Sequence, residues 1–392
     1  MTINTTKLTT VDNTEAEGYA TIAVNKDAAG SAVTVNGGEV VITGTHANDS
    51  KVASIGSDGS SINFNDTIGA TNDDIEGKNF AILYGNNWYQ FSTLEDAIAK
   101  AVEGDVITLI RDITVTETMV IEEDQTVILD LNGKSINVGL DEGSETNHIY
   151  AFENRGTLTI KDTKGNGVIN ARGNFNYGTM TLESGTINAI YGNGGSAILN
   201  YKGAFTMNGG TIATTYEDDN KVDNGGYDAT TLRVDEGATA VINGGVVNNI
   251  CDYTFAVENH GNTTVKGGTF TSVHSTVSTY GVMTIDGGTF TCDGLEGITA
   301  HALVAWEGSE TTINGGTFDG KDNYNGFNVD ACKGANVVIK GGNFLPVHSG
   351  SLYGEGTITV SGGTFFDKIG DSRLAEGYKV EENNGVYSVV AK

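Results

Sequence analysis

An eight-residue pattern of apolar and polar positions recurs through the second half of the chain. Its copies MTIDGGTF, ending at Phe290, and TTINGGTF, ending at Phe318, place one apolar residue five positions before another, with a Gly-Gly pair between them. Side chains of a strand alternate between its two faces, so the apolar residues face one side and the threonines the other. Glycine tolerates the positive φ of a tight corner, and the pattern therefore predicts two short strands joined at the Gly-Gly pair. The pairs in this register are Leu182/Ile187, Met207/Ile212, Ile242/Val247, Val265/Phe270, Ile285/Phe290, Ile313/Phe318, Ile339/Phe344 and Val360/Phe365, with Leu131/Ile136 and Val35/Val40 as earlier copies.

Each copy is preceded by a further glycine corner and a further strand. Strands such as FAVEN (255–259) and GFNVD (326–330) come before the corner, and successive copies lie 20 to 35 residues apart. Three short strands, two fixed corners and one variable loop per copy predict an all-β, right-handed parallel β-helix of about ten three-strand coils. An antiparallel sandwich is the alternative, but it would not keep one register across ten segments. The upstream corners lie at Gly178, Gly203, Gly237, Gly261, Gly281, Gly308, Gly334 and Gly356.

The ends of such a solenoid expose unpaired strand edges and need caps. Residues 79–105 are expected to form an N-terminal capping segment with a helix, for which Ser92 is the predicted N-cap and Glu95 completes a capping box. The coils are expected to occupy residues 106–366.

Two further segments flank this arrangement. Residues 367–392 alternate apolar and polar residues around Asn384-Gly385, which predicts a capping hairpin. Residues 1–78 are rich in Thr, Asn, Asp and Ser, and they are expected to form a small N-terminal β-rich attachment domain or an extended arm.

Composition supports the solenoid and narrows the partners. The chain has 55 glycines, which suit the repeated corners. It has one proline, because stacked parallel strands need their backbone N–H groups in the ladder. Its net charge of −28 repels nucleic acid and anionic membranes, so neither is an expected partner. The three cysteines, Cys251, Cys292 and Cys332, have no disulfide or zinc spacing and are expected to be reduced thiols.

Several stretches resemble a known class of module. The run YQFSTLEDAIAKAVEGDVITLIRDITV (89–115), the Gly-Gly-Thr-Phe repeats and the closing EGYKVEENNGVYSVV (376–390) are similar to pectate-lyase-like parallel β-helix modules of gut-bacterial surface adhesins and of phage fibre and spike proteins. The likeness covers residues 79–392 and is specific for the fold. It implies an adhesive or structural role.

These observations lead to one expected function and two alternatives. The first is a non-enzymatic structural fibre or decoration protein of a phage-like virion, on the capsid or tail surface. Residues 1–78 would bind other virion proteins, and the β-helix would present loops to host-surface glycans. By analogy with other fibres and spikes, the chain is expected to form a homotrimer. The N-terminal sequence shows no secretory leader, which favours a virion protein over the first alternative, an extracellular bacterial cell-surface adhesin. The second alternative is a polysaccharide lyase or glycoside hydrolase.

No catalytic residue is predicted. Arginine, which lyase-like sites use as a base, occurs five times, and none of the Asn-Thr-Asp, Asp-Asp or Arg-Ile-Lys motifs appears in the right order. The inserted loop near residues 214–228 carries oxygen ligands that suit calcium, the one candidate cofactor, although its spacing is not that of an EF-hand. Trp306 is expected in the core or at a subunit contact. The calcium candidates are Asp218, Asp219, Asp223 and Asp228, and the glycan-contact candidates are Tyr216, Tyr227 and Tyr324.

Overall fold

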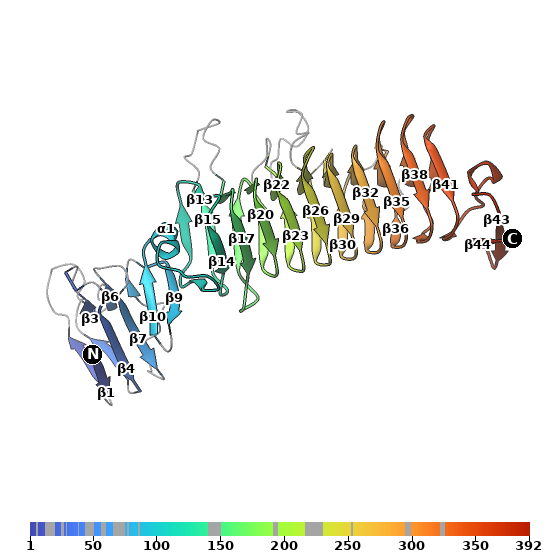
Figure 1. The fold of residues 1–392 in the computed structure, drawn as a ribbon. Coiled ribbons are helices and arrows are strands. Elements are labelled where there is room, and N and C mark those ends of the chain that lie inside the picture. The colour runs from blue at the N-terminus through green and yellow to red at the C-terminus, as the bar shows by residue number, and fades with distance from the viewer. Residues whose placement is uncertain are drawn as a thin grey trace. The chain divides into compact units, whose positions relative to one another are not determined.

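The chain consists of two compact units built almost entirely of β-strands (Figure 1). The computed structural model describes residues 1–4, 7–11, 20–24, 27–28, 30–37, 39–43, 51–55, 60–65, 75–76, 78–84, 87–139, 150–190, 195–215, 230–251, 254–294, 299–321 and 326–392. The first unit comprises residues 1–113, 125–135 and 161–164, and the second comprises 114–124, 136–160 and 165–392.

The N-terminal part of the first unit contains three small parallel sheets. The chain visits these sheets in turn, so strands of one sheet begin at Thr2, Ala32 and Ser61. Val35, Ala53 and Ile62 are fully buried between them. The sheets are β1 (Thr2–Asn4), β4 (Ala32–Asn36) and β7 (Ser61–Asn65); β2 (Leu8–Val11) and β5 (Val40–Thr43); and β3 (Ala20–Val24), β6 (Lys51–Ile55) and β8 (Ile75–Glu76). Residues 1–78 therefore include a coiled parallel arrangement of their own.

The rest of the first unit joins four strands and a helix. Strands β9 (Phe80–Tyr84) and β10 (Asn87–Phe91) pair antiparallel, and β9 also pairs antiparallel with β11 (Val106–Leu109). Strand β11 then pairs in parallel with β14 (Thr126–Asp130). The sheet therefore changes from antiparallel to parallel at β11, where the predicted coils begin.

Helix α1 (Leu94–Ile98) covers five residues, whereas the helical pattern of the sequence runs from Ser92 to Val102, and its N-cap is Thr93 instead of Ser92. Thr93 has extended backbone angles (φ −118°, ψ 159°), and its hydroxyl accepts the backbone N–H of Asp96 at 3.2 Å. The hydroxyl of Ser92 instead accepts a hydrogen bond from Lys78 Nζ at 3.0 Å. That the helix closes the end of the solenoid stays a prediction.

Three parallel sheets make up the second unit (Figure 1). The first contains β17 (Thr157–Lys161), β20 (Thr179–Leu182), β23 (Ala204–Met207), β26 (Thr239–Ile242), β29 (Asn262–Val265), β32 (Val282–Ile285), β35 (Glu310–Ile313), β38 (Asn336–Ile339) and β41 (Thr357–Val360). The second contains β12 (Ile113–Val115), β15 (Ser135–Val138), β18 (Val168–Ala171), β21 (Thr186–Ala189), β24 (Thr211–Thr214), β27 (Val246–Asn249), β30 (Thr269–Ser272), β33 (Thr289–Cys292), β36 (Thr317–Asp319), β39 (Asn343–Phe344) and β42 (Thr364–Phe365). The third contains β13 (Met119–Ile121), β16 (Phe152–Asn154), β19 (Phe175–Asn176), β22 (Ile198–Asn200), β25 (Leu232–Val234), β28 (Phe255–Asn259), β31 (Ser275–Thr279), β34 (His301–Ala305), β37 (Phe327–Ala331) and β40 (Gly350–Tyr353).

The order of the strands is consistent with the predicted parallel β-helix. Each sheet takes every third strand, so the chain passes through the three sheets once per coil. The register is the one read from the sequence: Ile285 pairs with Ile313 in the first sheet, and Phe290 pairs with Phe318 in the second. The repeated pairs therefore mark equivalent positions on successive coils.

Five phenylalanines on successive coils of the second sheet form a buried column, which we call the inner Phe stack. Its members are Phe270, Phe290, Phe318, Phe344 and Phe365. Neighbouring ring centroids are 4.6 to 5.0 Å apart, and the rings are parallel to within 13°. The strand spacing of about 4.8 Å imposes this separation, so identical residues in register stack on one another.

The corners require glycine because successive coils approach closely there. A Cβ on Gly281 would lie 2.2 Å from the carbonyl oxygen of Gly261, one coil earlier. The second corner also uses positive φ, which is +103° at Gly288. Close backbone approach and left-handed angles together explain the high glycine content.

The C-terminal residues form the hairpin that Asn384-Gly385 predicts. Strands β43 (Tyr378–Asn383) and β44 (Val386–Ala391) pair antiparallel around Asn384 and Gly385, whose φ angles are +53° and +80°. Strand β44 also pairs with β42, the last strand of the second sheet. A one-turn helix, η2 (Asp371–Arg373), precedes the hairpin. The hairpin thus covers one of the three sheet edges at this end.

Candidate functional site

The outward side of the third sheet carries a row of residues that lie one coil apart, which we call the outer row. Each directly follows a strand of that sheet, and its backbone N–H bonds to the coil before. Tyr201 N–H donates to Asn176 O at 3.0 Å, and Tyr280 N–H donates to Asn259 O at 2.7 Å. The members of the outer row are Arg155, Tyr177, Tyr201, Asp235, His260, Tyr280, Trp306 and Cys332.

Buried asparagines fix the point at which three strands of the third sheet end and their outer-row residues follow. Asn154 donates from its side-chain amide to the amide oxygen of Asn176 at 2.8 Å, and Asn176 donates to Asn200 in the same way at 2.8 Å. All three side chains are fully buried, and each ends its strand. Buried amides need such partners, and the ladder holds the corner in one register. The next residue then turns to the solvent side.

Three rings of the outer row stack face to face. The His260 and Tyr280 centroids are 4.4 Å apart with planes 2° from parallel, and those of Tyr280 and Trp306 are 5.5 Å apart at 4°. The indole N–H of Trp306 donates to the Ser278 hydroxyl at 2.8 Å, which fixes that ring. We call His260, Tyr280 and Trp306 the outer trio.

A second aromatic pair lies earlier in the row. The Tyr177 and Tyr201 centroids are 5.6 Å apart, with planes inclined at 56°. Burial raises the pKa of the Tyr177 phenol, with a smaller contribution from the negative charge of Glu153. Burial likewise raises the pKa of Tyr280. Both phenols are therefore neutral hydrogen-bond donors at neutral pH.

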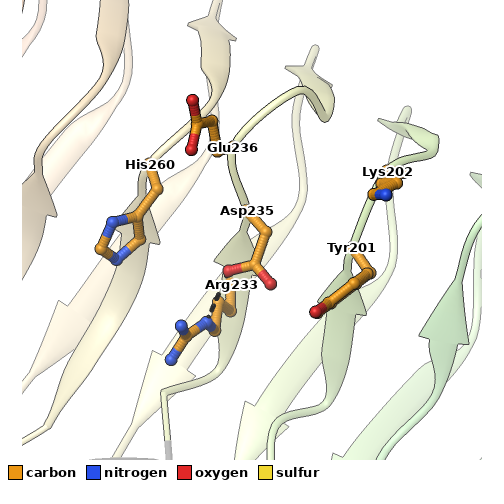
Figure 2. A pocket seen from close by; sticks show the side chains of 6 residues that line it. All are labelled: Tyr201, Lys202, Arg233, Asp235, Glu236 and His260. Atoms are coloured by element: carbon orange, nitrogen blue, oxygen red, sulfur yellow. Dashed lines mark hydrogen bonds and ion pairs between the residues drawn. The ribbon is translucent and has the colours of Figure 1, made fainter.

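A hollow of about 300 Å³ lies between Tyr201 of the tyrosine pair and His260 of the outer trio. Figure 2 shows the six side chains that line it. At this coil the row position is Asp235, whose small side chain replaces a ring. Arg233 Nε donates to Asp235 Oδ1 at 2.8 Å at the centre of the site. The lining residues come from β22, β25 and β28 or the corners after them, and they are Tyr201, Lys202, Arg233, Asp235, Glu236 and His260.

A shielded carboxylate holds the histidine wall of the hollow in place. Glu258 Oε1 accepts a hydrogen bond from His260 Nε2 at 2.7 Å, and Oε2 accepts one from the Thr230 hydroxyl at 3.1 Å. Arg233 Nη1 lies 3.9 Å from Oε1. The Glu258 side chain is only 11% exposed, so these three partners compensate its desolvation.

The arrangement brings donors, acceptors and ring faces together at one solvent-facing hollow. Arg233 and Lys202 supply cationic donors, and Asp235 and Glu236 supply acceptors. Aromatic rings from the two neighbouring coils flank them. Ligand sites in proteins combine aromatic or apolar walls with placed polar groups, and this hollow sets two aromatic side chains beside four charged ones.

The site predicted from the sequence is not this one. The calcium candidates Asp218, Asp219, Asp223 and Asp228 and the glycan-contact candidates Tyr216, Tyr227 and Tyr324 all lie outside the described residues. Trp306, expected in the core or at a subunit contact, lies just after β34 and is partly exposed in the outer row. Its polar indole N–H reaches Ser278, and its ring lies on Tyr280, so a position at the surface suits it.

The sequence did contain a trace of the outer row. Its members come one or two residues before the glycines of the upstream corners, as in Tyr177-Gly178, His260-Gly261 and Tyr280-Gly281. The recurrence of aromatic residues at that offset from the corner glycines was the signal in the sequence that could have indicated the row. Only the coil register shows that they form one row.

Among the described residues, the remaining thiols and metal-ligand side chains are not grouped into a second site. Cys251 and Cys292 are buried, and Cys332 is half-buried in the outer row. Burial raises the pKa of Cys292 to about 12, so its thiol is not a nucleophile at neutral pH. Within the described residues, no three His, Cys, Asp or Glu side chains are grouped to hold a metal ion. The described helices are too short or too polar to span a membrane.

Comparisons with known proteins return no relative. No family model matches the chain, and no curated protein or solved structure matches it. The likeness to β-helix modules therefore rests on the sequence repeats and on the parallel sheets.

Proposed function

We propose that the chain is a non-enzymatic structural solenoid that binds host-surface glycans through its outer row. The observation that carries this proposal is the hollow at Asp235, with aromatic residues on the coils beside it and paired charges within it. Sugars bind proteins through apolar contact with aromatic rings and hydrogen bonds to their hydroxyls. The outer row offers both on one face of a rigid sheet.

The proposed setting is the surface of a phage-like virion, as a fibre or decoration protein. Residues 1–78 attach to other virion proteins, the coils are right-handed and end in caps, and the assembly is a homotrimer. The parallel sheets and the net charge of −28, which suits a soluble particle surface, support this setting. Mass spectrometry of purified particles and of cell-envelope fractions tests it. Detection in the envelope fractions alone supports the bacterial adhesin instead.

Glycan binding is tested with the full chain and a panel of immobilised polysaccharides, by interferometry. We expect saturable binding to at least one of them. Tyr201→Ser removes a ring that borders the hollow and is expected to weaken binding at least tenfold. Tyr353→Ser is the matched control, because Tyr353 is also an exposed tyrosine of the third sheet, six coils from Tyr201. Equal losses in both variants contradict a site at the hollow.

The structure gives one specific reason to consider a polysaccharide-degrading enzyme. Asp235 and Glu258 both approach Arg233, and two carboxylates on either side of a sugar are what glycoside hydrolysis uses. Incubating the purified chain with the same panel and assaying new reducing ends or unsaturated products decides the matter. We expect no release. Release that Glu258→Gln abolishes supports the enzyme.

A further inference from the structure

Stacking within the outer trio leaves one ring face open toward the hollow. Tyr280 lies between His260 and Trp306, so both of its faces are approached by neighbouring rings. One face of His260 is covered by Tyr280, which belongs to the following coil. Because the two rings are parallel, the opposite face of His260 points to the preceding coil, where Asp235 stands. The trio thus has two outer faces: that of Trp306 points to the following coil, where Cys332 stands, and that of His260 points to the hollow.

The spacing of the coils sets the width of the space beside that face. Tyr201 lies on the β22 coil and His260 on the β28 coil, with the β25 coil between them. Two coil spacings separate the Tyr201 and His260 backbones by about 9.6 Å. A ring in van der Waals contact on both sides needs about 7–8 Å, because carbon atoms in contact are about 3.5–4.0 Å apart. The remainder accommodates the puckered, thicker ring of a pyranose.

The charges around the hollow select against an anionic ligand. Lys202 and Arg233 bring two positive charges, while Asp235, Glu236 and the adjacent Glu258 bring three negative ones. The net charge of the whole chain is −28. A carboxylated or sulfated sugar would approach against this field. A neutral sugar instead finds acceptors for its hydroxyl protons and donors for its hydroxyl oxygens.

We infer that the hollow between Tyr201 and His260 is a slot for a single neutral sugar ring, the terminal or branch residue of a host glycan. The ring enters with its plane parallel to His260, and its inner edge meets the Arg233–Asp235 pair. A terminal ring carries a single linkage and can turn its whole opposite edge, with hydroxyl groups only, to the Arg233–Asp235 pair. A ring within a chain can enter only with both linkages along the open sides of the slot, so the slot favours a terminal or branch ring. This inference rests on the proposed glycan binding and specifies the part of the glycan that is bound.

The test uses branched glycans before and after removal of their branches. The full chain is titrated with galactomannan, xyloglucan and arabinogalactan, with the same polymers after enzymatic debranching, and with polygalacturonate as an anionic chain. We expect at least one branched neutral polymer to bind at least tenfold more tightly than its debranched form. We expect no binding to polygalacturonate.

A variant that fills the slot tests its position. Asp235→Tyr continues the aromatic row through the hollow, and it is expected to weaken binding at least tenfold while the melting temperature and circular dichroism are retained. Tyr201→Ala, which removes an exposed wall of the slot, serves the same purpose if Asp235→Tyr does not fold. Tyr353→Ser is expected to change the affinity by less than twofold.

The outcomes separate the slot from the wider proposal. Binding that survives both Asp235→Tyr and debranching overturns the slot but leaves glycan binding by this chain intact. Preferential binding of polygalacturonate also overturns the neutral slot alone. Absence of binding to every glycan of the two panels overturns the slot together with the proposed function.

Discussion

Two of the aromatic stacks on the coils, the inner Phe stack and the outer trio, have similar geometry and different surroundings. In the inner Phe stack the rings are parallel to within 13° and at most 1% exposed. In the outer trio the planes agree to within 4°, but Tyr280 is 37% exposed. Ring stacking stabilises a pair by about 0.5–1.5 kcal/mol in addition to the gain from burial. Burial of a phenylalanine side chain by itself contributes about 1.5–3 kcal/mol. The coil spacing therefore produces both stacks, and burial decides which one holds the fold together.

The largest effect is expected inside. Phe318 has a stacked phenylalanine on each side, so Phe318→Ala leaves a cavity between two rings. We expect a loss of about 3–5 kcal/mol in the free energy of unfolding, measured by urea denaturation at pH 7. Tyr353→Ala is the control, because Tyr353 is 53% exposed. A loss below 1 kcal/mol for Phe318→Ala would contradict the conclusion that the inner Phe stack holds the fold together.

His301, a buried residue of the third sheet, tests the contrast between buried and exposed rings through the pH dependence of stability. Burial lowers the pKa of His301 to about 4, and the nearby His274 also lowers it. The ring accepts the Phe327 N–H on Nδ1 at 3.2 Å, and its Nε2 lies 3.6 Å from Asp330 Oδ2. A histidine with a depressed folded pKa takes up its proton more readily when unfolded. Its stabilising contribution is therefore complete above pH 6.5 and is lost as the pH falls toward 4.

The magnitude follows from the size of that shift. We expect the wild type to lose about 3 kcal/mol more than His301→Gln between pH 7 and pH 4. Denaturation curves of the two proteins at matched pH values measure the difference, since the carboxylates common to both cancel. Parallel pH profiles would mean that His301 is solvated, as an outer-row residue would be.

The inner stack was predictable from the sequence, and the outer row was not. Phe290 and Phe318 recur at a fixed offset from their Gly-Gly pairs, so their shared face followed from strand alternation alone. Tyr201 and His260 stand at different distances from their corner glycines, and variable loops precede them. Their juxtaposition depends on the coil register, and the slot depends on Asp235 occupying a position where neighbours have rings. The short helix α1 also differs from its pattern, because its length depends on tertiary contacts more than on propensity.

The corners give a smaller, local test of the same packing. Gly281→Ala places a Cβ 2.2 Å from the Gly261 carbonyl oxygen, and the two coils must separate to admit it. We expect a loss of about 1–3 kcal/mol in unfolding free energy, as for overpacking of a core. Gly370→Ala is the matched control, because its φ is −67° and the nearest atom to a new Cβ is 4.0 Å away. Equal stability of both variants would show that the corners yield freely.

The smallest effect on stability is expected at the outer trio. Tyr280→Leu removes the stack but keeps an apolar side chain, so the expected loss in unfolding free energy is about 1 kcal/mol. The relative loss of glycan affinity should exceed the relative loss of stability, because the His260 ring loses the partner that holds it beside the slot. Denaturation and binding measured on the same preparation separate the two effects. A stability loss as large as that of Phe318→Ala would require the trio to be buried in solution. In that case the outer row is an interface between copies of the chain, and its rings serve assembly instead of recognition.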